Sequence, residues 1–224
     1  MKYEKLNEIK DIQYNIVSLG HNCLPRTILT RWGIKPSKEK GENSMPFDLA
    51  TYETFEITKQ IKENFKNIFE NLEYKKHDYQ SGKNNYWTKK PDLIEFIHEK
   101  NLNEKDKQKL IEIYTNRIIN FRKCVEDDTP ILFVQLIGDC DDTENLFTEL
   151  KKLRKDKPFL FVVIDPFNLT KDNPNIHTLR LKYPSPNYQY LWWSLPYYSS
   201  KDGKKFEKDI VDFCIEKIKL LKNL

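Results

Sequence analysis

The sequence predicts an α/β fold: a three-layer sandwich around a mostly parallel sheet of four to five strands, with a helical insertion after the first strand. Three observations support this prediction. Residues 130–138 and 158–165 are nearly all apolar and rich in β-branched and aromatic residues, which is typical of strands buried on both faces. Residues 141–157 between them place leucines at helical spacing. A strand, a helix and a second strand in this order nearly always form a parallel pair.

The first strand and the first helix are predicted from residues 16–33. Residues 16–19 are a short apolar run after a polar leader. Apolar residues then recur at helical spacing over residues 24–32, and Pro25 suits a first helical turn, where a missing N–H costs little. Gly33 ends this predicted helix.

The predicted insertion covers residues 51–125. An apolar stripe predicts a helix over residues 51–72, and residues 90–100 predict a short one. Residues 73–90 are rich in turn formers and aromatic residues, so we expect an irregular loop or a short hairpin there. Residues 103–125 carry the longest helical pattern, with apolar side chains three and four positions apart.

The C-terminal part adds one strand and one helix. Residues 175–183 alternate as a strand does, residues 187–200 form an aromatic loop, and residues 202–222 predict a closing helix. No internal repeat or low-complexity linker interrupts the chain, so we expect residues 1–224 to form one α/β domain.

Composition restricts the possible partners. The chain has 38 Lys and Arg against 34 Asp and Glu, a formal charge of +4, and these residues are scattered rather than clustered as on a nucleic-acid-binding face. No apolar run approaches the roughly 18 residues that suggest a membrane-spanning helix, and the charged N-terminal segment lacks an apolar signal core. We therefore expect no nucleic-acid partner, no membrane contact and a cytoplasmic location.

Several common site motifs are absent. The sequence has no Gly-rich phosphate loop, no G-x-G-x-x-G, no G-x-S-x-G and no His/Cys pair at metal-ligand spacing. We expect no cofactor and no metal, and a small-molecule, peptide or glycan substrate; the oligomeric state is not predicted. The four cysteines are far apart and predict reduced thiols rather than a disulfide framework: Cys23, Cys124, Cys140 and Cys214.

Cys23 is the strongest candidate for a reactive residue. It follows the first predicted strand, at the edge of the sheet where α/β proteins bind ligands, and it directly precedes a helix. A helix N-terminus favours an anion, which lowers the pKa of a thiol. The alternative is a small buried cysteine that covers the joint between strand and helix. We interpret the other three cysteines as structural.

Four histidines are available as the base that a thiol nucleophile needs. His77 lies in a turn-rich loop, where catalytic residues are common, and its neighbour Asp78 is a candidate to orient it. His177 is the second choice. His21 is expected to point away from Cys23, and His98 is expected to be solvated on a charged helix.

Five further residues are candidates for the site. Asp48 follows a proline and is either a helix cap or a carboxylate that orients the base. Arg117 and Arg122 flank the apolar stripe of the long helix, where they pair with a carboxylate or bind an anionic group of the substrate. Trp87 and Trp193 fall in predicted loops, where they line a substrate groove or cover an edge of the core.

Five segments resemble, in order, a family described as papain-like cysteine peptidases, known mainly from bacteria and large DNA viruses and often encoded near surface-glycan genes. They are SLGHNCLPRTILTRWGI, SMPFDLA, HDY, YTNRIINFRK and ILFVQL. The resemblance covers residues 16–164. It implies a thiol, an amide, a carboxylate, a histidine and helix arginines at Cys23, Asn22, Asp48, His77, Arg117 and Arg122. Papain-like enzymes also carry the histidine on an antiparallel sheet, which residues 131–164 do not predict.

Two functions follow as hypotheses. In the first, the protein is a cysteine-dependent hydrolase or acyl transferase in which Cys23 attacks a carbonyl and N–H groups near Asn22 hold the oxyanion. His77 or His177 moves the proton, and Asp48 or Asp78 orients this base. In the second, it is a glycan-associated transferase or a carbohydrate- or nucleotide-sugar-binding protein that uses the first strand–helix turn as an anion site. A purely structural or host-interaction protein is the third possibility.

Overall fold

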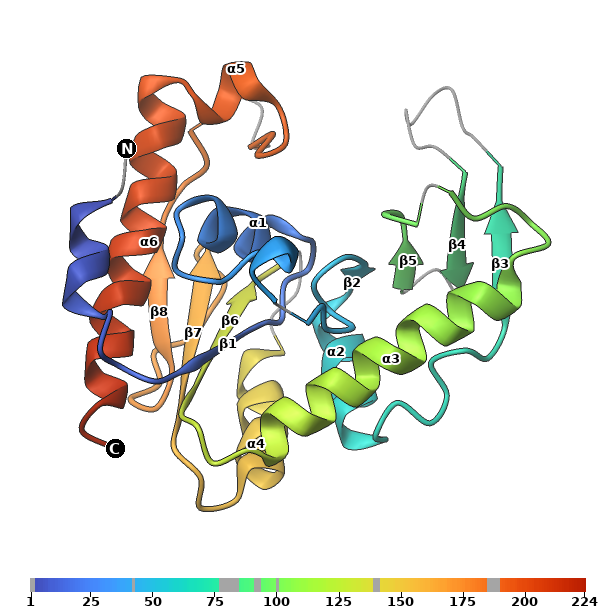
Figure 1. Ribbon diagram of the computed structural model, residues 1–224, viewed down its shortest axis with the longest axis horizontal. Coiled ribbons are helices and arrows are strands. Elements are labelled where there is room, and N and C mark those ends of the chain that lie inside the picture. The colour runs from blue at the N-terminus through green and yellow to red at the C-terminus, as the bar shows by residue number, and fades with distance from the viewer. Residues whose placement is uncertain are drawn as a thin grey trace.

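A parallel sheet forms the centre of the larger part of the chain (Figure 1). The computed structural model describes residues 3–41, 43–76, 85–90, 94–99, 101–138, 142–184 and 190–224. The four parallel strands are β1 (Asn15–Ser18), β6 (Ile131–Leu136), β7 (Phe159–Asp165) and β8 (His177–Arg180), in the order β1-β6-β7-β8. The fold is mixed α/β, and the predicted parallel sheet is confirmed.

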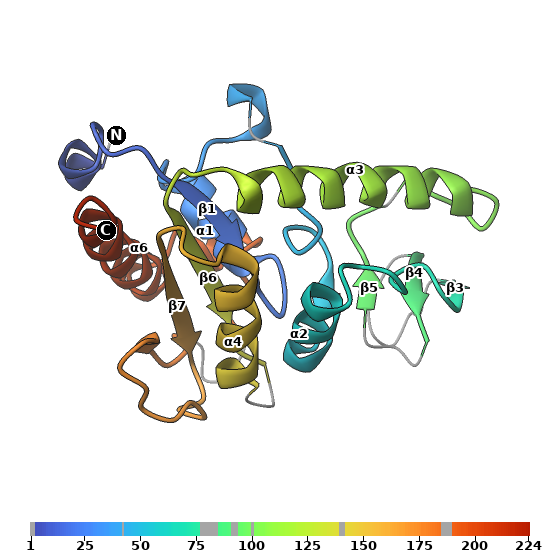
Figure 2. The same cartoon turned by 90° about the horizontal axis from the view of Figure 1, so that it is seen from below.

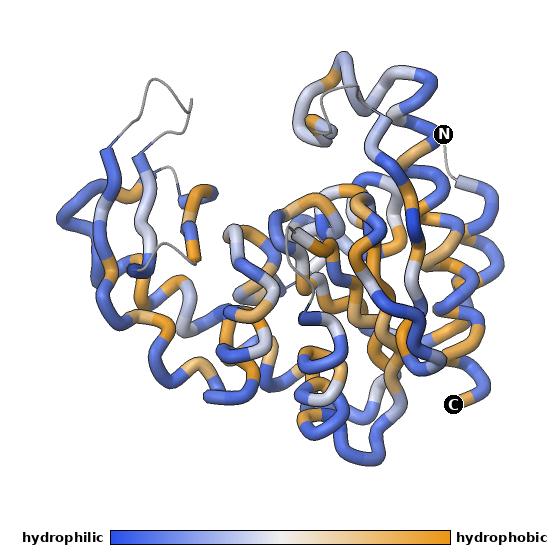
Figure 3. The backbone as a smooth tube through the Cα atoms, turned by 180° about the vertical axis from the view of Figure 1, so that it is seen from behind, coloured by the Kyte–Doolittle hydropathy of each residue, from blue (hydrophilic) through white to orange (hydrophobic). Residues whose placement is uncertain are grey.

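Each face of this sheet has its own apolar core, because neighbouring residues along a strand point to opposite faces. Leu132 and Val134 of β6 belong to the core that contains α1 (Leu24–Arg31) and α6 (Lys201–Leu221). Ile131 and Phe133 belong to the other core, with leucines of α4 (Thr143–Arg154). The apolar character of the strands stands out in Figure 3.

The insertion between β1 and β6 holds a second sheet, which corrects the prediction of a helical insertion. Its strands are antiparallel in the order β2-β5-β4-β3. The elements are β2 (Thr51–Tyr52), α2 (Thr54–Lys62), β3 (Leu72–Lys75), β4 (Tyr86–Lys89), β5 (Ile94–Phe96) and α3 (Lys107–Glu126). The long helix α3 runs from the parallel sheet to this antiparallel sheet (Figures 1 and 2).

Local backbone geometry explains why the predicted helix over residues 51–72 stops early. Asn64 and Phe65 take positive φ angles of 52° and 59°, and Asn71 takes 53°. Left-handed residues cannot continue a right-handed helix, so α2 ends at Lys62 and a series of turns leads to β3. The predicted short helix over residues 90–100 is also wrong, because Ile94 to Phe96 is a strand.

The remaining elements are short, apart from the closing helix α6, which is confirmed. A four-residue helix, α5 (Leu195–Tyr198), lies within the predicted aromatic loop. Two 3-10 helices cover Glu4–Glu8 and Lys38–Lys40. Within the described ranges no helix combines the length and the apolar character needed to span a bilayer.

The turn from β1 to α1 requires glycine at position 20. A Cβ atom on Gly20 would lie 2.2 Å from the carbonyl oxygen of Asn22 and 3.0 Å from Cδ of Pro25. The first of these atoms is backbone, so the clash can be relieved only if the turn itself moves. Gly20 therefore allows the chain to fold back tightly in front of Cys23.

We expect Gly20→Ala to lower the free energy of unfolding by about 3 kcal/mol, because overpacking against backbone cannot be relieved by a rotamer change. Urea denaturation followed by circular dichroism measures this change. Gly41→Ala is the comparison, since its Cβ would meet no atom within 4 Å and the variant carries only the cost of a positive φ. Equal losses in the two variants would show that the Gly20 turn is not specially constrained.

Candidate functional site

Cys23 and His98 come together where the two sheets meet. Cys23 occupies the N-cap position of α1 and is only 7% exposed. His98 follows β5 by two residues, and its Nε2 lies 3.2 Å from the Sγ atom of Cys23, within hydrogen-bond distance. The expectation that His98 sits on a solvated helix is corrected: the residue is exposed, but it lies in a turn after a strand and its ring contacts the thiol.

A two-residue strand brings these residues together. The backbone N–H of Tyr52 in β2 donates to the carbonyl of His21 at 3.0 Å, and Nδ1 of His21 donates to the carbonyl of Tyr52 at 3.1 Å. Tyr52 is also paired with Ile94 of β5. The turn that carries Cys23 and the strand that leads to His98 are therefore both attached to β2.

Burial raises the pKa of the Cys23 thiol above its ordinary value, which corrects the expectation of a lowered pKa. The indole N–H of Trp192, the hydroxyl of Thr27, the backbone of Cys23 itself and the charge of Arg26 act in the opposite direction, in that order. Desolvation outweighs them because a thiolate loses its hydration when it is buried. A base in contact with the sulfur is thus needed to generate the nucleophile at neutral pH.

Asn22 caps the first turn of α1. Its Oδ1 accepts a hydrogen bond from the backbone N–H of Leu24 at 2.9 Å, and Pro25 has no N–H to offer. The side chain thereby fixes the turn on either side of Cys23. A direct part for Asn22 in oxyanion binding stays a prediction.

The SMPFDLA segment, residues 44–50, is mostly buried. Asp48 is fully buried; its Oδ2 accepts from the backbone N–H of Met45 at 2.8 Å and lies 3.7 Å from Nε of Arg26. Its Oδ1 lies 3.9 Å from Nζ of Lys35. The carboxylate thus neutralises Arg26, which is on the same helix as Cys23, and its predicted role in orienting the base stays a prediction.

The two helix arginines bind other parts of the protein. Arg117 NH2 lies 2.5 Å from Glu99 Oε1, and the guanidinium stacks over the ring of Tyr114 at 4.4 Å. Glu99 is the neighbour of His98, so Arg117 anchors the turn that carries the imidazole. Arg122 donates to the side chain and the backbone carbonyl of Asn64.

The other candidate residues are placed apart. His77 and Asp78 lie outside the described residues. Trp87 is buried in β4 against Tyr74, at a ring distance of 5.3 Å. His177 begins β8, at the opposite edge of the sheet from β1.

An aromatic pocket of about 270 Å³ opens at the carboxyl ends of the parallel strands, beside the turn that leads to Cys23. His21 and Asn22 form one wall, and Trp193, which is 63% exposed, forms part of the rim. Four more aromatic residues line it: Phe167, Tyr183, Tyr190 and Trp192. No described lining residue is Asp, Glu, Lys or Arg, so the pocket suits an uncharged group with an apolar face.

His98 is the candidate site residue that sequence reasoning did not select. The available signal was the spacing of Ile94 and Phe96, two apolar residues two positions apart, which is typical of one face of a strand. Both are fully buried in the structure. Among the described residues no cluster of three His, Cys, Asp or Glu side chains is arranged to hold a metal.

We expect Asp48→Asn to lower the free energy of unfolding by about 3 kcal/mol, because it removes the buried negative charge that faces Arg26 and Lys35. Asparagine keeps an acceptor for the Met45 N–H, so the loss reports the charge. Urea denaturation measures it. Asp128→Asn is the control: its side chain is 94% exposed in a surface pair with Lys157, and the change should be negligible. A similar, small loss in both variants would contradict this role of Asp48.

Comparison with known proteins places the chain in a family. A family model described as "Putative papain-like cysteine peptidase" matches residues 14–160, which include both Cys23 and His98. No curated protein and no solved structure matches the chain. The match covers most of the chain, and the protein belongs to this papain-like cysteine peptidase family.

Proposed function

We propose that the protein is a cysteine-dependent hydrolase or acyl transferase in which Cys23 is the nucleophile and His98 is the base. The observation that carries this proposal is the 3.2 Å contact between His98 Nε2 and Cys23 Sγ. A thiol and an imidazole at this distance can exchange a proton directly. The family match supports the same chemistry.

The reaction would proceed through a thioester. His98 takes the proton of the Cys23 thiol, the sulfur attacks a substrate carbonyl carbon, and the carbonyl electron pair moves onto oxygen. The leaving amine or alkoxide takes the proton from the imidazolium as its bond to the carbonyl carbon breaks. Water or another acceptor, deprotonated by His98, then attacks the thioester and releases the acyl group, and the sulfur regains a proton.

The chain's other described cysteines are poor competitors for this role. Burial raises the pKa of Cys124 to about 11 and that of Cys214 to about 12. At neutral pH both thiols therefore stay protonated. Cys23 combines a thiol with a base at hydrogen-bond distance.

The aromatic pocket beside the turn that leads to Cys23 supports a substrate with an uncharged, apolar group next to the reacting carbonyl. A carboxylate that entered this pocket would be buried without a counter-charge, because no described lining residue is Lys or Arg. A neutral peptide side chain or the apolar face of a sugar ring fits this chemistry, so both peptide and glycan esters belong in a first screen.

The alternative of an anion site at the first strand–helix turn has less support. The Leu24 N–H already binds Asn22, and Arg117 and Arg122 already contact Glu99 and Asn64. We therefore retain it only as the outcome that follows if Cys23 proves unreactive.

We expect His98→Ala to reduce the alkylation rate of Cys23 by iodoacetamide at pH 7, and to lower hydrolysis of a fluorogenic peptide-amide library by about 10³-fold, because the general base is lost. Cys23→Ala should abolish hydrolysis. Peptide mass spectrometry resolves the alkylation by cysteine, and initial rates measure the hydrolysis.

His77→Ala and His177→Asn are the matched histidine controls. His177 lies at the far edge of the sheet, so this variant should behave like the wild type. If His77→Ala removes activity and His98→Ala does not, His77 is the base and the assignment of His98 is wrong. If Cys23→Ala retains full activity, covalent catalysis through this thiol is excluded.

We expect Trp193→Ala to raise KM for neutral aromatic substrates about tenfold with little change in kcat, because it removes one side of the pocket and leaves the dyad intact. Alkylation by iodoacetamide, which is too small to need the pocket, is the internal control and should be unchanged. A fall in kcat alone would place Trp193 outside the substrate subsite.

A further inference from the structure

The C-terminal segment that covers the candidate site lies beyond the family match, which ends at residue 160. Trp192 of this segment lines the pocket beside Asn22. Its indole Nε1 is buried and makes no hydrogen bond of normal geometry to any described atom. A buried N–H without an acceptor is costly, so this indole N–H is available to an acceptor that forms beside it.

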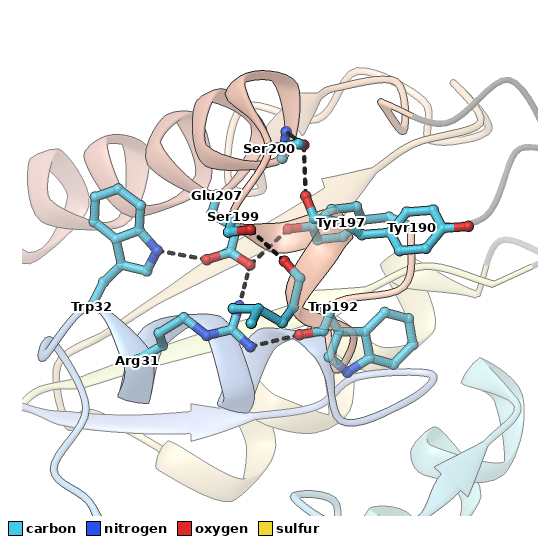
Figure 4. Close-up of polar contacts among 10 residues, drawn as sticks. Arg31, Trp32, Tyr190, Trp192, Tyr197, Ser199, Ser200 and Glu207 are labelled. Atoms are coloured by element: carbon cyan, nitrogen blue, oxygen red, sulfur yellow. Dashed lines mark hydrogen bonds and ion pairs between the residues drawn. The ribbon is translucent and has the colours of Figure 1, made fainter.

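A buried carboxylate holds this segment in place (Figure 4). Glu207 of α6 is 1% exposed and accepts hydrogen bonds from Arg31, from Nε1 of Trp32 at 2.7 Å and from the hydroxyl of Tyr190 at 2.8 Å. The same Arg31 donates through NH2 to the backbone carbonyl of Trp192 at 2.6 Å. Since Arg31 ends the helix that Cys23 begins, the network fixes Trp192 relative to the nucleophile.

The indole of Trp192 points away from this network. Figure 4 shows its carbonyl directed at Arg31 and its ring on the opposite side from Glu207. The backbone carbonyl of Trp192 thus anchors the segment to Arg31, and the indole side chain remains available to the candidate site. The indole N–H of Trp192 is also the first of the groups that favour the charged form of Cys23 and so lower its pKa.

We propose that Trp192 donates its indole N–H to the thiolate of Cys23, and that the Glu207–Arg31 pair positions Trp192 for this contact. The inference rests on the proposed function, because it assumes that Cys23 ionises during the reaction. When His98 removes the thiol proton, the sulfur becomes a strong acceptor and the unpaired N–H gains its partner. The donor therefore stabilises the charged state selectively, which is what lowers a reaction barrier.

The test is the pH dependence of Cys23 alkylation by iodoacetamide in the full chain, resolved by peptide mass spectrometry. We expect Trp192→Phe to raise the apparent pKa of Cys23 by about one unit and to slow alkylation at pH 7 about tenfold. Replacing Trp192 by β-(3-benzothienyl)alanine keeps the shape of the ring and removes only the N–H, so it should cause the same shift. Arg31→Met, which frees the Trp192 carbonyl, should shift the pKa in the same direction.

Tyr197→Phe is the control, since it removes an exposed hydroxyl from the same segment and should leave the profile unchanged. An unchanged apparent pKa in the benzothienyl variant would overturn the proposal, because packing is preserved there. If His98→Ala still shifts the profile in that case, the proposed function stands and only the role of Trp192 fails. If neither variant shifts it, both fail.

Discussion

The structure depends on the attachment of its two sheets through Tyr52. The backbone of this residue is bonded to both the carbonyl and the imidazole of His21, and it pairs with Ile94 across the antiparallel sheet. A proton passes between a thiol and an imidazole only at hydrogen-bond distance. The few hydrogen bonds of β2 therefore set the distance between Cys23 and His98, which lie on different parts of the fold.

Phe47 and Asp48 of the SMPFDLA segment support this attachment. The ring of Phe47 meets Tyr52 at 5.1 Å and Phe121 at 5.7 Å, and both contacts are edge-to-face. Asp48, the next residue, is buried beside Arg26 of α1. Aromatic packing and a buried charge pair thus hold α1, β2 and α3 together. Phe47 and Asp48 thus have a structural role that does not require Asp48 to contact the imidazole of His98.

Three separate parts of the chain meet at the candidate site. The β1–α1 turn supplies the thiol, the turn after β5 supplies the imidazole, and the segment before α5 supplies the tryptophans of the pocket. The family match includes the first two parts and stops before the third. The candidate thiol and imidazole and the aromatic side of the pocket therefore come from different regions of the sequence.

The sequence by itself determined the parallel sheet, the long helices and the position of Cys23 at a strand–helix turn, because hydrophobic periodicity and glycine sterics act locally. It offered a short hairpin as one of two interpretations of residues 73–90, which the antiparallel pairing of β3 with β4 confirms. It did not predict that β2 and β5 extend this pair into a sheet, because strands of two and three residues are too short to show a period. Only the tertiary structure decided that His98, 75 residues from Cys23, is the histidine at the thiol. It also decided that the Cys23 pKa is raised. Both depend on burial and on contacts between distant segments, which local patterns do not encode.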